Sequence, residues 1–192
     1  RERCTATGAL LIMDEAQTGF GRTGKLWGFQ HFDCEPDILL LAKAIGGGMP
    51  LGAFIASQEH MRTFTENPVL GHITTFGGHP VSCASGLAAF NVLMEGNLIA
   101  SVESKGQLFE SLLTENQHIK SFRRKGLMMA LEFESAELNQ KIVHQCVKNG
   151  LVTDWFLFAP HCLRICPPLT ISPTQIEVAC LLLLKSIAEI TN

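Results

Sequence analysis

The chain of 192 residues contains 46% hydrophobic and 17% charged residues and has a formal net charge of -3. This composition is typical of a folded globular protein, and the length allows one large domain or two small ones. The slightly acidic balance gives no electrostatic basis for binding nucleic acid or an anionic membrane surface. No apolar run reaches the roughly 18 residues that a membrane helix needs, so we expect no membrane segment.

The seven cysteines are odd in number and scattered, and no two of them form a CxxC pair. Reduced thiols in a cytoplasmic protein therefore explain them better than disulfides or zinc. The histidines show no ligand spacing such as HExxH, so we expect no metal site. The chain starts at Arg1 without a charged and then apolar leader, and we expect no targeting peptide.

Two short apolar runs in the first quarter of the chain, 8–13 and 38–42, predict strands of a buried sheet. A charged residue follows each run, Asp14 after the first and Lys43 after the second. The ends of such strands border the crevice in which an open α/β sheet usually holds its ligand. The sequence therefore predicts a site that contains both side chains.

Glycines 46–48 and Pro50 interrupt the chain after Lys43. A strand, a short helix, a loop and a helix rich in small residues are predicted next, at 51–56, 57–64, 67–78 and 80–94. The small residues of the last helix allow close packing on the sheet. A domain boundary near Gly96 would divide the chain into domains 1–96 and 97–192.

The second domain alternates between helices and strands. The predicted elements are a helix from Asn97 to about 113, a strand at 126–133, a helix at 136–149, strands at 151–158 and 162–165, and a helix from 172 to about 190. Ser172 and Gln175 have the spacing of a capping box at the start of the last helix.

Three motifs carry a family resemblance: DEAQTGFGRTG at 14–24, PDILLLAKAIGGGMPLGA at 36–53 and TTFGGHP at 74–80. In order and spacing they resemble the class III aminotransferases, which depend on pyridoxal phosphate (PLP), and among these the acetylornithine and ornithine aminotransferases. The resemblance implies an α/β fold, the PLP-dependent transferase fold type I, with part of a large domain on a mainly parallel sheet and a small α+β C-terminal domain. Members are roughly twice as long, so strand edges and apolar faces are expected to be exposed.

The resemblance also implies cofactor-binding residues. Lys43 would form a Schiff base with the PLP aldehyde, and the Asp14 carboxylate would face the pyridine nitrogen. Gln17 would bind the ring hydroxyl oxygen, whereas Glu15 would point away from the ring. A lysine at a strand end is expected to be partly desolvated, with a lowered pKa. The alternatives are a lysine that only reaches solvent and an aspartate that caps a helix or lies in a solvated loop.

Thr74 and Thr75 offer hydroxyl groups for the PLP phosphate, and by resemblance Thr75 serves the neighbouring subunit, which implies a homodimer with shared active sites. The sequence departs from the family at His79, where asparagine is usual, and at Ile73, where glycine is usual. Arg164 lies among apolar neighbours and by resemblance grips a substrate carboxylate or pairs with a gating glutamate. A structural ion pair is the alternative.

The expected function is a PLP-dependent transaminase of amino-acid metabolism. It would move an amino group from an ω-amino or (acetyl)ornithine-type donor to a 2-oxo acid such as 2-oxoglutarate. One alternative keeps the fold and cofactor in an aminomutase or racemase. The other is a catalytically incomplete fragment, or a chain whose role is assembly.

Overall fold

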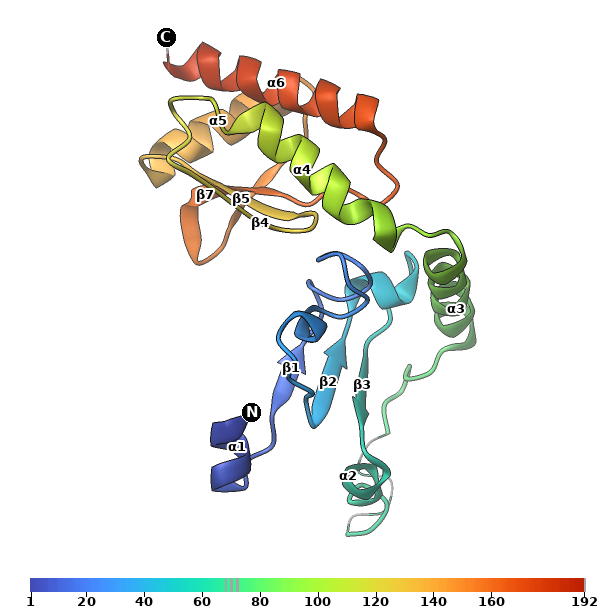
Figure 1. Ribbon diagram of the computed structural model, residues 1–192. Helices are drawn as coiled ribbons and strands as arrows, with labels where there is room; N and C mark the ends of the chain where they lie inside the picture. Colours follow the sequence, from blue (N-terminus) through green and yellow to red (C-terminus); the bar gives the residue numbers. More distant parts are fainter. Residues whose placement is uncertain (68, 70, 72, 192) are drawn as a thin grey trace. The chain divides into compact units, whose positions relative to one another are not determined.

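The computed structural model describes residues 1–67, 69, 71 and 73–191. The chain divides into two compact units (Figure 1): unit 1 comprises Arg1–Gly21 and Lys25–Asn97, and unit 2 comprises Arg22–Gly24 and Leu98–Asn192. The change of unit after Asn97 lies next to the boundary that the sequence predicts near Gly96.

Unit 1 contains a three-stranded sheet in the order β1 (Ile12–Asp14), β2 (Ile38–Leu41), β3 (Ala53–Ala56). Strands β1 and β2 are parallel, whereas β2 and β3 are antiparallel, so the sheet is mixed. The connection between β1 and β2 holds the 3₁₀ helix η1 (Gly28–His31), and η2 (Lys43–Gly46) follows β2.

Unit 1 also contains the α-helices α1 (Glu2–Thr7), α2 (Gln58–Arg62) and α3 (Pro80–Glu95). The predicted strand over 8–13 is wrong in its first half. Gly8 adopts a left-handed conformation with φ 70°, and its N–H bonds to the carbonyls of Cys4 and Thr5. The glycine therefore ends α1, a helix that the sequence pattern does not predict, and leaves a strand of three residues.

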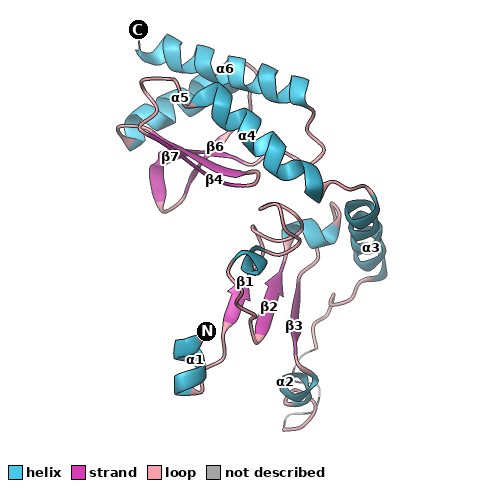
Figure 2. Cartoon of the chain, in the orientation of Figure 1, coloured by secondary structure: helices cyan, strands magenta, loops and turns pink. Residues whose placement is uncertain are grey.

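Unit 2 contains an antiparallel sheet in the order β4-β5-β7-β6. Figure 2 shows α4, α5 and α6 in cyan on one face of this sheet. The elements of unit 2 are η3 (Ile99–Ser101), α4 (Val102–Leu113), β4 (Ser121–Lys125), β5 (Met128–Glu132), α5 (Ala136–Lys148), β6 (Asp154–Phe156), β7 (Ala159–Ile165) and α6 (Pro173–Thr191).

Two sequence predictions for unit 2 have clear outcomes. The capping box of α6 is confirmed, because Ser172 Oγ accepts from the Gln175 N–H and Gln175 Oε1 accepts from the Ser172 N–H. Strand β4 was missed, because its sequence SFRRK is mostly polar. It forms the edge of the sheet, where charged side chains are common.

The two units differ in how they bury apolar side chains. Unit 2 holds a continuous core that includes Leu131, Leu163 and Ile187, each with no exposed surface. In unit 1 the sheet residues Ile12 and Ile55 remain 52% and 53% exposed. Their exposure agrees with the expectation from the sequence that apolar faces would be exposed.

Among the described residues, no single helix has both the length and the apolar character to cross a membrane. One bent pair of consecutive helices, Pro80–Glu95 and Ile99–Leu113, passes that test on length and composition alone. All seven cysteines are free thiols.

Cysteine burial leads to a first prediction. Burial raises the pKa of the Cys180 thiol to about 12 and also raises the pKa of Cys146. Because the thiolate is the reactive form, iodoacetamide near neutral pH should leave both residues unmodified in the folded protein and modify them in urea. The exposed Cys83 and Cys166 serve as internal controls. Peptide mass spectrometry measures this, and modification of Cys180 as fast as Cys166 would contradict the burial.

Candidate functional site

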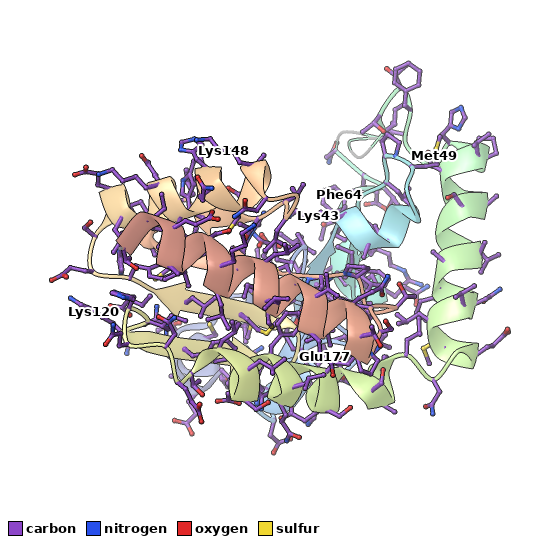
Figure 3. All side chains as sticks on the ribbon, turned by 90° about the horizontal axis from the view of Figure 1, so that it is seen from above. Lys43, Met49, Phe64, Lys120, Lys148 and Glu177 are labelled. Atoms are coloured by element: carbon purple, nitrogen blue, oxygen red, sulfur yellow. The ribbon has the colours of Figure 1, made fainter. Side chains whose placement is uncertain are left out.

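The parallel pairing of β1 and β2 brings two predicted site residues to one edge of the unit 1 sheet. Asp14 is the last residue of β1 and pairs with Leu40 of β2. Lys43 follows the end of β2 and begins η2, where Figure 3 labels it. Because parallel strands end on the same side of a sheet, the carboxylate and the amine belong to the same edge.

Lys43 has an unusual backbone conformation, with φ 55° in the left-handed region. This region is sparsely populated by residues other than glycine, and such conformations concentrate at functional sites. The side chain is exposed and forms no ion pair or hydrogen bond with any described residue. The partial desolvation expected from the sequence is therefore wrong for this chain, because Lys43 stands beyond the last paired residue of β2.

Helix α3 holds the backbone that follows Lys43. A Cβ atom at Gly86 would lie 2.3 Å from the Ile45 carbonyl oxygen, and one at Gly47 would lie 2.5 Å from the Ser85 carbonyl oxygen. Ser85 Oγ also donates to the Gly47 carbonyl at 2.9 Å. The small residues of α3 therefore pack on η2 and on Gly47, which follows it.

Asp14 and Gln17 keep polar atoms at the surface. Asp14 Oδ1 accepts a hydrogen bond from the Ala16 N–H at 2.9 Å, which orients the exposed carboxylate. The Gln17 side chain is exposed and has no partner among the residues described. Both side chains are thus available to a ligand.

Glu15 points into the protein, with only 3% of its surface exposed. Its carboxylate accepts from the N–H groups of Gly28 at 2.8 Å and Phe29 at 2.7 Å, and from the Thr18 hydroxyl. A buried carboxylate is stable when several donors surround it. Glu15 therefore folds the loop between β1 and η1, a role that its position directly after a strand does not reveal.

Thr74 and Thr75 lie in the exposed segment before α3, outside any helix or strand. A Cβ atom at Gly77 would lie 2.3 Å from Thr74 Oγ1, so the glycine makes room for this hydroxyl. His79, one of the departures from the family motif, caps α3 because its Nδ1 accepts from the Val81 N–H. Pro68, Leu70 and His72 of the predicted loop lie outside the described residues.

Arg164 belongs to β7 of unit 2 and faces Asp154 of β6 across the strand pair. Its Nη2 lies 3.0 Å from Asp154 Oδ2, and the two side chains are 35% and 50% exposed. The structural ion pair, one of the alternatives from the sequence, is therefore present. Exposed pairs contribute only about 0 to 1 kcal/mol, so the contact orients Arg164 without holding it rigidly.

The unit 1 residues have complementary chemistry. Lys43 offers an amine that forms no ion pair with any residue the structure describes, Asp14 offers a carboxylate, Gln17 an amide, and Thr74 and Thr75 hydroxyl groups. An amine can bond covalently to a carbonyl carbon, a carboxylate can hold a protonated ring nitrogen, and hydroxyl groups can donate to phosphate. The set fits a cofactor that has an aldehyde, a ring nitrogen and a phosphate.

A comparison with protein-family models matches residues 1–187 to the class III aminotransferases. Solved structures of aminotransferases also match this chain. An ornithine aminotransferase from Toxoplasma gondii ME49 matches with a TM-score of 0.89 and 31% sequence identity, over 99% of this chain and 46% of that one.

Two further structures agree. A second structure of the Toxoplasma gondii ornithine aminotransferase, described with partial occupancy of PLP at its active site, has a TM-score of 0.88 and 32% identity, over 99% of this chain and 46% of that one. A Bacillus anthracis aminotransferase has a TM-score of 0.90 and 31% identity, over 98% and 46% of the two chains. The chain thus spans about half the length of these proteins.

The contact between α3 and η2 predicts a selective effect of one methyl group. Gly86→Ala should lower the free energy of unfolding by about 1 to 3 kcal/mol, because the added Cβ meets a backbone oxygen. The matched control is Gly52→Ala, where the nearest atom, the Leu41 carbonyl oxygen, lies at 3.6 Å; its effect should stay within about 0.5 kcal/mol. Urea unfolding measures both, and equal values would contradict the close packing.

Proposed function

Because the chain belongs to the class III aminotransferase family, we propose that it forms part of a PLP-dependent aminotransferase. The observation that carries the proposal is the placement of Asp14 and Lys43 at one edge of a parallel strand pair. The family match and the free amine of Lys43 support the same conclusion.

Each polar side chain at the edge where β1 and β2 end has a role in binding PLP or in its chemistry. The cofactor, when bound, supplies an electron sink for the negative charge that develops on the substrate carbon. Lys43 Nζ would hold the cofactor through its aldehyde carbon and would move the proton at the substrate carbon. Asp14 keeps a proton on the ring nitrogen. Gln17 binds the ring hydroxyl oxygen.

The hydroxyl groups of Thr74 and Thr75 would bind the phosphate of PLP. In the proposed homodimer Thr75 donates to the phosphate in the neighbouring subunit, so that two subunits share each active site. The exposed apolar side chains of unit 1 support an extensive contact with further protein. A chain half as long as its relatives also supports a contribution from further polypeptide. The catalytically incomplete fragment remains the competing proposal for the 192 residues alone.

The proposed reaction transfers an amino group from an ω-amino or (acetyl)ornithine-type donor to a 2-oxo acid such as 2-oxoglutarate, in the cytoplasm. The similarity to ornithine aminotransferases at 31% and 32% identity supports this class of donor. Arg164 would orient a substrate carboxylate, with Asp154 as its partner before substrate binds.

The role of Lys43 is tested by its attachment to the cofactor. In the full polypeptide, Lys43→Ala should abolish the visible absorption of bound PLP and the borohydride-stable mass increase of one cofactor, because the bond to Nζ cannot form. Lys25→Ala, which removes another exposed lysine of unit 1, is the matched control and should keep both signals. Attachment that survives in Lys43→Ala would remove Lys43 from the mechanism.

The reaction class is tested with the amino donor alone. Ornithine or N-acetylornithine, given to the PLP-loaded protein without acceptor, should yield one carbonyl product per site and then stop until 2-oxoglutarate is added. Chromatography of the products measures this stoichiometry. Continuous conversion of the donor to an isomer without acceptor would favour the aminomutase or racemase.

A further inference from the structure

Three side chains that bind metals well meet on the sheet of unit 2. They are Glu132 of β5 and His161 and Cys162 of β7, and their ligand atoms all lie within 4.8 Å of one another. Among the residues that the structure describes, this is the one group of three such side chains. It belongs to unit 2, whereas the proposed PLP residues belong to unit 1.

Strand pairing holds the group together. Glu132 and Cys162 are directly opposite in the antiparallel pair of β5 and β7, so their side chains share one face of the sheet. Their neighbours Leu131 and Leu163 lie in the core with no exposed surface. Because side chains alternate along a strand, Glu132 and Cys162 point to the face opposite the helices. The Phe133 N–H donates to the His161 carbonyl at 3.0 Å and fixes the backbone of the third member, whose Nε2 lies 3.9 Å from Glu132 Oε1.

The two oxygens of Glu132 have different surroundings. Oε2 accepts from Arg123 Nη1 at 2.6 Å and from Ser121 Oγ at 2.8 Å. Oε1 faces His161 Nε2 at 3.9 Å, which is too far for a hydrogen bond. One oxygen is therefore anchored, while the other and the imidazole nitrogen face each other across a gap.

Solvent reaches this gap, since the side chains of His161 and Glu132 are 42% and 28% exposed. Cys162 is buried, and its Sγ accepts from Arg123 Nη2 at 3.3 Å. Arg123 thus bridges two members of the group with its positive charge. The carboxylate of Glu132 and the sulfur of Cys162 therefore already bind one cation, the guanidinium group of Arg123.

We propose that Glu132 Oε1, His161 Nε2 and Cys162 Sγ bind a single Zn²⁺ ion, with water as the fourth ligand. Sulfur, nitrogen and oxygen donors suit zinc, and three protein ligands with one water are a common zinc arrangement. Bonds of roughly 2.0 to 2.3 Å place ligand atoms about 3.5 Å apart, so the side chains must approach by about 1 Å.

On binding, the Cys162 S–H bond breaks, its proton passes to solvent, and the sulfur forms a bond to zinc. The thiolate and the carboxylate together balance the charge of the ion. Ser121 and Arg123 remain on Oε2 and orient the carboxylate, as outer contacts do in zinc sites. The contact between Arg123 and Sγ is the one that the metal replaces.

Cobalt(II) is the direct probe, because a cobalt bond to thiolate gives an intense near-ultraviolet absorption. The full polypeptide, freed of metal by chelation, should bind one Co²⁺ with this absorption and lose it to Zn²⁺ in competition. Cys162→Ser should abolish the absorption, and His161→Ala should weaken binding at least about 10-fold. Cys166→Ser, which removes an exposed cysteine just beyond β7, should leave both unchanged.

Two further variants test the displacement of Arg123 and the independence of the zinc site from the PLP site. Arg123→Gln should bind Co²⁺ more tightly than the wild type, because it removes the guanidinium nitrogen that competes with the metal for Cys162 Sγ; weaker or equal binding would overturn the displacement of Arg123 from Sγ. Lys43→Ala should keep full metal binding, so failure of the PLP proposal would leave the zinc proposal intact.

Thermal unfolding with and without Zn²⁺ supplies the independent measurement. Zinc should raise the unfolding temperature of the wild type and of Cys166→Ser but not that of Cys162→Ser. Absence of the thiolate absorption in the wild type, or its survival in Cys162→Ser, would overturn the proposal.

Discussion

The parallel pairing of β1 with β2 is the constraint that creates the candidate site. The register from Ile12 with Ile38 to Asp14 with Leu40 makes both strands end on one side of the sheet. A shift by one residue would turn every side chain of a strand to the opposite face. A single strand pairing therefore decides that a carboxylate and an amine from distant parts of the sequence belong to the same site.

Two different kinds of contact stabilise the backbone at that edge of the sheet. On the side of β1, the buried Glu15 binds backbone N–H groups and folds the loop behind Asp14. On the side of β2, glycines allow α3 to pack against the backbone that follows Lys43. The first contact is electrostatic and the second is steric, and neither uses a residue proposed to touch the cofactor.

The two units contribute in different ways. Unit 2 has a closed apolar core between one face of its sheet and three helices. The other face carries polar side chains, including the pair of Arg164 with Asp154 and the group around Glu132. Unit 1 leaves apolar side chains of its sheet exposed. Unit 2 thus buries a core of apolar side chains, whereas unit 1 leaves those of its sheet partly exposed. Such exposure is expected of a chain that covers about half the length of its relatives.

Residues close together in the chain were enough to predict the family, the strand ends at Asp14 and Lys43, and the cap of α6 at Ser172. Helix α1 and strand β4 escaped prediction, since a glycine that ends a helix and a polar edge strand give weak periodic signals. The roles of Glu15 and Asp154, and the meeting of Glu132 with Cys162, emerged only from the folded chain. They could not be predicted because strand register and loop folding join residues whose spacing in the sequence carries no trace of their contact.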